Sequence, residues 1–278
     1  MTAEVVKLIV SDMDFTLVDN DRNIPEEIFP LVKRLRAQGI RFMVASARHH
    51  HNLYVSFKPV ADEMGYICDN GAYAEVDGQG LVSRVMDHAT IVRLLDVVET
   101  IPGVYTMLCT KDAMYYSKTP YYLENPPKDL PENEAFCTIK VPDLREVKED
   151  VYRVALCDPA DPRKHSVPLL LEKFGDELNI VATDFESVDI MLPGVNKGSG
   201  LAEVQRKLGI TPAETMVFGD YLNDIPMLRQ AEYSFAMANA LDEVKAACNY
   251  LAPSNQDKGV IRVVEQYLAD PSSLIPQK

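Results

Sequence analysis

Two acids separated by a single residue follow a short apolar run near the start of the chain. The run covers residues 5–10 and is interrupted only by Lys7, which is about the length of a buried strand in a parallel sheet. Asp12 and Asp14 come directly after it. In open α/β sheets the ligand crevice lies outside the carboxyl ends of the strands, so such a fold would bring both carboxylates to that crevice. An Asp-x-Asp sequence also forms solvated turns, and the pair alone does not separate these alternatives.

The order of strand and helix patterns predicts a doubly wound α/β core. Residues 25–39 have the apolar spacing of a helix that ends at Gly39, and residues 40–45 follow as a second buried strand. The same alternation returns near residue 197 and continues to about residue 268. We therefore expect a Rossmann-like parallel sheet with helices on both faces.

The middle of the chain has a different pattern. Between residues 83 and 187 several strand candidates follow one another directly, with helices expected only near residues 89–100 and 162–174. Strands joined in this way favour antiparallel pairing, which is typical of an α+β domain. We predict a catalytic core made of residues 1–82 and 188–278, with a cap domain inserted at residues 83–187.

The charge of the chain limits its partners. The 278 residues carry a formal net charge of −14, which disfavours nucleic acids and anionic membrane surfaces. Phosphorylated metabolites are also repelled at long range, so a site for them needs strong local positive charge. We expect a small-molecule partner, and no obligate protein partner is evident.

The cysteines and the N-terminus indicate the compartment. The five cysteines contain no C-x-x-C pair, so neither a zinc site nor a disulfide framework is indicated. The first residues lack the basic and apolar segments of a signal peptide, and no run approaches about 18 apolar residues. We expect a cytoplasmic protein.

Three more groups of polar residues fall at predicted strand ends or helix starts. Ser46 and Arg48 follow the second strand. Lys197 lies in the first turn of a helix, where a cation opposes the helix dipole unless an anion binds there. Asp220, Asn223 and Asp224 would share one face of a helix that starts just after Asp220. An exposed lysine and an N-capping aspartate are the structural alternatives.

In this order the four groups resemble the four motifs of the haloacid dehalogenase superfamily of phosphatases. The chain is most similar to the Cof-type sugar-phosphatase branch, whose large cap is inserted between the second and third motifs. Asn70-Gly71-Ala72 and Gly219-Asp220-x-x-Asn223-Asp224 add to the resemblance, which covers essentially the whole chain. Phe15 stands where this branch usually has Gly, and Ser46-Ala47-Arg48 replaces Thr-Gly-Arg. Both changes should narrow the pocket and alter the substrate range.

The resemblance implies a role for each motif residue. Asp12 would be the nucleophile, and Asp14 the general acid and base. Mg²⁺ would be held by Asp12, Asp220 and the backbone carbonyl of Asp14. The phosphoryl group would be bound by the backbone amides of Met13 and Ala47 and by Ser46, Lys197 and Asn223. Asp224, Arg48 and Asn70 would support this site or contact the substrate.

The resemblance therefore implies a phosphoric monoester hydrolase that depends on Mg²⁺. It would hydrolyse a small phosphorylated metabolite, preferably a sugar phosphate, through an aspartyl-phosphate intermediate. A phosphosugar mutase is the enzymatic alternative, and it would release an isomerised product instead of free phosphate. A non-catalytic sensor of phosphometabolites is the other alternative, against which the intact pair Asp12 and Asp14 argues.

Overall fold

The computed structural model describes residues 5–120, 137–183, 186–274 and 276. These residues form two compact units. The first takes its described residues from Met1–Arg48, Phe57–Val82 and Asn196–Lys278, and the second from His49–Ser56 and Ser83–Val195. Within the described ranges, none of the helices combines the length and the apolar character needed to cross a bilayer.

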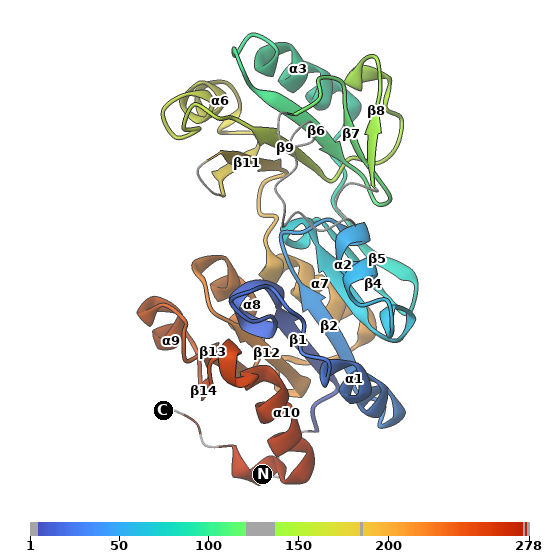
Figure 1. Ribbon diagram of the computed structural model, residues 1–278, viewed down its shortest axis with the longest axis vertical. Coiled ribbons are helices and arrows are strands. Elements are labelled where there is room, and N and C mark those ends of the chain that lie inside the picture. Colours follow the sequence, from blue (N-terminus) through green and yellow to red (C-terminus); the bar gives the residue numbers. More distant parts are fainter. Residues whose placement is uncertain (1–4, 121–136, 184–185, 275, 277–278) are drawn as a thin grey trace. The chain divides into compact units, whose positions relative to one another are not determined.

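The first unit is built on an eight-stranded sheet with the order β14-β13-β12-β1-β2-β3-β4-β5 (Figure 1). The pairs from β14 to β3 are parallel, whereas β3 and β4 are antiparallel. The strands are β1 (Leu8–Asp12), β2 (Arg41–Ala45), β3 (Gly65–Cys68), β4 (Tyr73–Val76), β5 (Gln79–Ser83), β12 (Thr215–Gly219), β13 (Tyr233–Met237) and β14 (Tyr250–Ala252).

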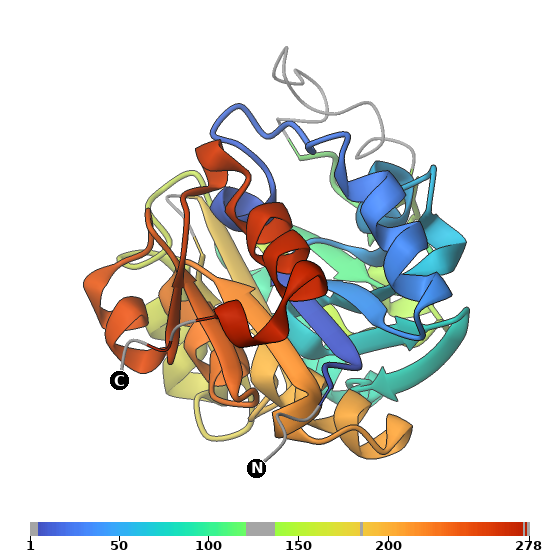
Figure 2. The ribbon, with the colours of Figure 1, turned by 90° about the horizontal axis from the view of Figure 1, so that it is seen from below.

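Helices flank this sheet (Figure 2). They are α1 (Ile28–Ala37), α7 (Lys197–Leu208), α8 (Ile225–Leu228), α9 (Asp242–Ala247) and α10 (Gly259–Ala269). The connection β1-α1-β2 runs along the sheet in one direction and β12-α8-β13 in the other. Right-handed crossovers that run in opposite directions place α1 and α8 on opposite faces. The strand order reverses between β1 and β12, so the crevice expected of a doubly wound sheet lies at their carboxyl ends. The predicted Rossmann-like core is confirmed.

The first strand begins and ends later than its apolar run. Val5 is 68% exposed, whereas all residues from Leu8 to Asp12 are buried. Ser11 and Asp12 belong to the strand because they are paired with Val44 and Ala45 of β2. The nucleophile candidate is therefore the last residue of a central strand, held on a backbone that is hydrogen-bonded to its neighbours.

The second unit has a six-stranded sheet with the order β10-β11-β9-β6-β7-β8. All its pairs are antiparallel except β7 with β8. Apolar residues of α3, α6 and the strands form its core. The elements are α2 (His50–Ser56), α3 (His88–Val98), α6 (Ser166–Phe174), β6 (Tyr105–Cys109), β7 (Met114–Tyr116), β8 (Thr138–Lys140), β9 (Arg153–Cys157), β10 (Asn179–Ala182) and β11 (Ser187–Met191).

The units differ from the expected boundaries at two segments. Residues 188–195 were expected in the core, but β11 pairs with β10 on one side and β9 on the other, so it lies inside the second sheet. The helix α2 also groups with the second unit. The strands β4 and β5 were not predicted, although the Asp77-Gly78 turn between them, with φ of 52° and 73°, is a hairpin signal.

Candidate active site

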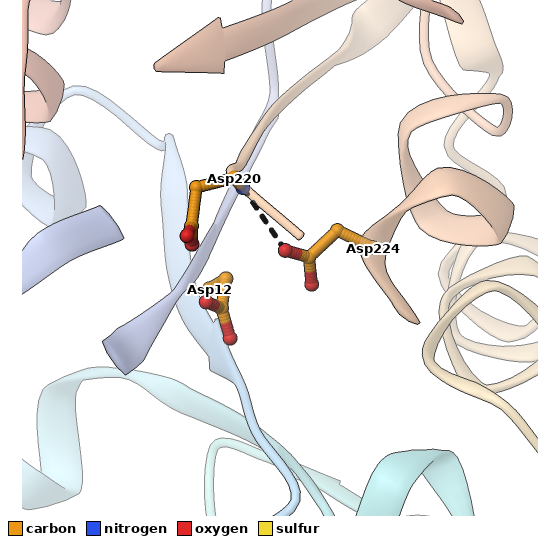
Figure 3. A group of neighbouring side chains, drawn as sticks. All are labelled: Asp12, Asp220 and Asp224. Carbon is orange, nitrogen blue, oxygen red and sulfur yellow. Dashed lines mark hydrogen bonds between the residues drawn. The ribbon is translucent and has the colours of Figure 1, made fainter. Parts of the chain in front are cut away.

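Three carboxylates meet where the strand order of the first unit reverses (Figure 3). Asp12 ends β1, Asp220 follows β12, and Asp224 comes from the short turn beyond it. One oxygen from each lies within 4.8 Å of the others. All three residues are buried, with Asp224 fully inaccessible. The fold therefore gathers two of the predicted metal ligands, Asp12 and Asp220, with Asp224, which was expected to support the site or contact the substrate.

The position of Asp224 follows from a loop that turns back on itself. Its Oδ2 accepts a hydrogen bond from the backbone N–H of Asp220 at 3.0 Å (Figure 3). It accepts a second from the backbone N–H of Tyr221 at 3.1 Å. A short 3-10 helix, Leu222–Asp224, follows Asp220, and the α-helix α8 begins only at Ile225, so Asp220, Asn223 and Asp224 do not lie on one face of a single α-helix. A Cβ at residue 219 would lie 2.6 Å from that of Asp224, so this close approach requires Gly219.

Lys197 is the cation of the cluster. It is the first residue of α7 and is only 2% exposed, so the alternative of an exposed lysine does not hold. Its Nζ donates hydrogen bonds to Asp12 and, at 2.7 Å, to Asp224. Asn196 caps the helix by accepting from the backbone N–H of Ser199 at 2.9 Å. This cap fixes where α7 begins and therefore where Lys197 lies.

The turn after β3 supports the start of α7. Gly71 has a φ of 96°, and a Cβ at this position would lie 2.3 Å from the carbonyl oxygen of Asn196. Glycine therefore satisfies both the left-handed backbone and the close contact. The Asn70-Gly71-Ala72 turn identified in the sequence holds the helix that carries Lys197.

The ionisation of the cluster reflects burial and crowded negative charge. Burial, together with the neighbouring Asp224, raises the pKa of Asp12 well above its ordinary value. Burial also raises the pKa of Asp220 to about 6. Burial opposes the charged form of Lys197, but the carboxylates of Asp12 and Asp224 outweigh it and raise the pKa of the ammonium.

The donor set fits a small divalent cation. Three carboxylates surround one ammonium, so the fully ionised cluster would carry two more negative charges than Lys197 neutralises. Oxygens on opposite sides of a Mg²⁺ ion are about 4.2 Å apart, and one oxygen from each of the three carboxylates lies within 4.8 Å of the others, so these oxygens are near enough to share one ion. Without a cation, burial and the neighbouring Asp224 raise the pKa values of Asp12 and Asp220. A cation bound among these carboxylates would favour their ionised forms.

Asp14 points its carboxylate to a different partner. Arg48 donates to it from Nε at 3.0 Å and from Nη2 at 2.6 Å. The Oγ of Ser46 accepts from the backbone N–H of Arg48 at 3.1 Å, which fixes the turn after β2. Asp14 and Ser46 line one pocket of about 330 Å³ with five other predicted residues, Asp12, Ala47, Lys197, Asp220 and Asn223. Phe15, which was expected to narrow the pocket, and Tyr221, for which the sequence predicted no role in the site, line the same pocket.

Met13 and Asn70, both predicted at the site, present backbone groups to it. The side chain of Met13 is buried, which leaves its backbone as the group offered to a ligand. Asn70 adopts a left-handed conformation with φ 53°, and its backbone N–H donates to the carbonyl of Ser46 at 3.1 Å.

Two further residues were not identified from the sequence. Thr16 is buried and donates from Oγ1 to Asp220 at 2.6 Å. Asn239 donates from Nδ2 to the carbonyl of Phe15 at 2.8 Å. A hydroxyl four residues after Asp12 was a usable signal for Thr16, whereas Asn239 is 224 residues from its partner and no local pattern indicates it.

Comparisons with known proteins agree with this geometry. The family model of haloacid dehalogenase-like hydrolases matches residues 9–264. A curated Escherichia coli protein named 5-amino-6-(5-phospho-D-ribitylamino)uracil phosphatase YbjI is 33% identical over 267 residues, covering 95% of this chain and 96% of the relative. Another from E. coli, named pyridoxal phosphate phosphatase YbhA, is 25% identical and covers 96% and 100% of the two chains. The solved structure of SMU.1108c from Streptococcus mutans superposes with a TM-score of 0.79 at 28% identity, covering 95% of this chain and 100% of that one.

Proposed function

The chain belongs to the haloacid dehalogenase-like hydrolase family, and on this premise we propose that it is a Mg²⁺-dependent phosphatase acting on a phosphorylated sugar or sugar alcohol. The family membership confirms the resemblance expected from the four motifs. It also confirms the prediction of an enzyme that hydrolyses phosphoric monoesters. The metal, the substrate class and the role of each residue are proposals.

The contact between Asp12 and Lys197 carries the proposal. Asp12 ends a central strand with its carboxylate in the pocket, and Lys197 holds one oxygen of that carboxylate. An oxygen of Asp12 attacks the phosphorus as the bond from phosphorus to the leaving oxygen breaks. Lys197 stabilises the charge that develops on the phosphoryl oxygens. Water then attacks the aspartyl-phosphate, which releases phosphate and restores Asp12.

Asp14 moves the protons in both steps. Protonated Asp14 donates to the departing alkoxide, and the resulting carboxylate takes a proton from the attacking water. Arg48 sets the direction of this carboxylate through its two hydrogen bonds. Asp14 therefore faces the same pocket as the nucleophile without joining the cluster of three acids.

Asp12, Asp220 and the backbone carbonyl of Asp14 would hold the Mg²⁺ ion. When bound, the ion offsets the repulsion between the Asp12 carboxylate and the phosphate ester. Thr16 fixes the direction of the Asp220 carboxylate. Asp224 holds Lys197 and the backbone of residues 220 and 221, and so positions both the cation and a metal ligand.

The phosphoryl oxygens would lie among neutral donors and one cation. Ser46, the backbone amides of Met13 and Ala47, and Asn223 complete the cradle that Lys197 begins. Ser46, Ala47 and Asn223 line the pocket with Lys197. These local donors would offset the long-range repulsion between a phosphorylated substrate and a chain of net charge −14.

The substrate class rests on the relatives and on the inserted unit. YbjI, by its name, acts on a 5-phospho-D-ribityl compound, in which the phosphate ester is carried by a sugar alcohol. We propose the same kind of phosphate ester here. We also propose that the second unit, which takes its described residues from His49–Ser56 and Ser83–Val195, is the cap that selects the leaving group.

A phosphate-release screen with purified protein and Mg²⁺ tests the proposal. The panel contains monophosphates of sugars, sugar alcohols, nucleosides and cofactors. We expect turnover of a sugar or sugar-alcohol phosphate that is lost on addition of EDTA and in Asp12→Asn. The matched control is Asp242→Asn, since the Asp242 side chain is fully exposed and its ion-pair partner is Lys245, outside the cluster. A silent panel, or turnover that survives in Asp12→Asn, contradicts the proposal.

A further inference from the structure

Phe15 has a backbone conformation that aromatic residues rarely adopt. Its φ of 59° and ψ of 6° lie in the left-handed region, where a Cβ crowds the following carbonyl. Glycine takes this conformation without strain. A bulky residue here indicates that the side chain has a use that offsets the strain.

The ring of Phe15 is also poorly buried. It is 49% exposed, although Met13, Thr16 and Leu17 around it are at most 2% exposed. The ring therefore gains little from packing within the protein. Neither backbone preference nor core packing accounts for a phenylalanine at this position.

The loop is held in place by side chains distant in sequence. Asn239 donates to the carbonyl of Phe15 at 2.8 Å and accepts from the backbone N–H of Asn255 at 3.1 Å. The buried Asn255 donates in turn to the carbonyl of Val18 at 3.0 Å. Two carbonyls of the loop are thus fixed by one connected network. The strained conformation is a defined feature of the fold and does not come from a loosely held loop.

The exposed ring borders the catalytic pocket. Phe15 and Tyr221 both line the cavity that contains Asp12, Ser46 and Lys197. Tyr221 is 56% exposed, so the pocket offers two accessible aromatic side chains. The polar donors surround the position proposed for the phosphoryl group. The two aromatic side chains are therefore available to contact the leaving group.

We propose that Phe15 is a specificity residue whose ring contacts the leaving group and, with Tyr221, selects phosphate esters that carry a planar unsaturated ring. Aromatic rings stack on such a group with a favourable geometry that a saturated sugar does not offer. This inference rests on the proposed phosphatase function and narrows its substrate class. Asn239 acts as a positioning residue that holds Phe15 toward the pocket.

Pairs of substrates with the same phosphorylated portion test the inference. Ribose 5-phosphate is compared with uridine 5′-monophosphate, and ribitol 5-phosphate with flavin mononucleotide, using the full-length protein with Mg²⁺. We expect the wild type to have a higher kcat/KM for the ring-bearing member of a pair. Phe15→Leu keeps an apolar side chain but removes the aromatic face, and should lower the ratio of kcat/KM within a pair about tenfold. Phe15→Tyr should keep the ratio within about twofold.

The ratio of kcat/KM within a pair separates a change in specificity from damage to the fold. Loss of folded protein lowers the apparent kcat/KM of both substrates in a pair by the same factor, so the ratio stays unchanged. Leu251→Ala, a change at another half-exposed apolar residue, is the matched control and should leave the ratio as in the wild type. An active wild type that prefers the ring-free members, or a ratio unchanged in Phe15→Leu, overturns this inference alone. A wild type that hydrolyses no member of either pair overturns the proposed function and this inference with it.

Discussion

Arg48 binds the carboxylate of Asp14 through two hydrogen bonds, from Nε at 3.0 Å and from Nη2 at 2.6 Å. Both residues lie in the first unit, Asp14 just after β1 and Arg48 just after β2. The planar guanidinium matches the carboxylate and fixes its direction. Arg48 therefore acts on the reaction through the orientation of the proposed acid and base.

Arg48→Lys should lower kcat by about tenfold to a hundredfold, because lysine cannot form the two parallel hydrogen bonds that orient Asp14. The KM should change much less. Steady-state kinetics on the best substrate of the screen measure both constants. Arg206→Lys, which alters an exposed pair with Glu203, is the control. A raised KM with unchanged kcat would show instead that Arg48 binds the substrate.

Lys197→Met should reduce kcat/KM by about a hundredfold to a thousandfold, because the phosphoryl charge loses its cation. It should also destabilise the protein by about 3–5 kcal/mol, since Asp12 and Asp224 are left buried without their partner. Chemical denaturation measures the free energy of unfolding. Adding Asp12→Asn to this variant should recover part of the lost stability, because it removes one of the uncompensated charges. Additive losses would argue against a shared ion cluster.

Mg²⁺ should raise the thermal midpoint of the wild type by several degrees at a concentration well above its Kd, because it binds only the folded cluster. Asp220→Asn should abolish most of this shift by removing a ligand. Differential scanning fluorimetry with and without EDTA provides the measurement. Asp242→Asn should behave like the wild type. An equal shift in Asp220→Asn would place the ion elsewhere.

In the metal-free protein, the Asp220 carboxyl should contribute a loss of stability as the pH rises from about 4 to 6. The pKa of Asp220 is about 6 in the folded state against an ordinary value of 3.8. Below pH 3.8 the group is protonated in both states, whereas in this window the folded state holds a proton that the unfolded state has released, so rising pH favours unfolding. The contribution is on the order of 2 kcal/mol. Asp220→Asn should flatten the loss of stability in this window when unfolding is measured in EDTA, and an unchanged slope would contradict the assignment.

Phe15→Gly should stabilise the protein by about 1 kcal/mol, which corresponds to about 2–4 °C in the thermal midpoint, because glycine relieves the left-handed strain. Arg22→Gly relieves a similar conformation with φ 63° outside the pocket and serves as the matched control. Both variants are compared by thermal denaturation. A destabilised Phe15→Gly alone would show that the ring is packed in the folded protein.

Much of the architecture follows from local sequence. Apolar spacing located α1 and α7, because a buried helix face repeats every three to four residues. Gly209 was expected to end α7, and it does so in the left-handed conformation with φ 65°. Asp12 and Asp220 were expected at strand ends, and the sheet brings both to the reversal between β1 and β12. These features depend on residues near one another in the chain.

The tertiary structure alone decided how the polar groups pair. Lys197 reaches Asp12 across 185 residues, and Asp224 joins the cluster because its loop folds back on the backbone of Asp220. The assignment of β11 to the second sheet depended on strand pairing in the same way. The sequence by itself determined which side chains could do this chemistry and on which elements they lie. The directions and partners of those side chains come from packing between distant segments, which local periodicity does not encode.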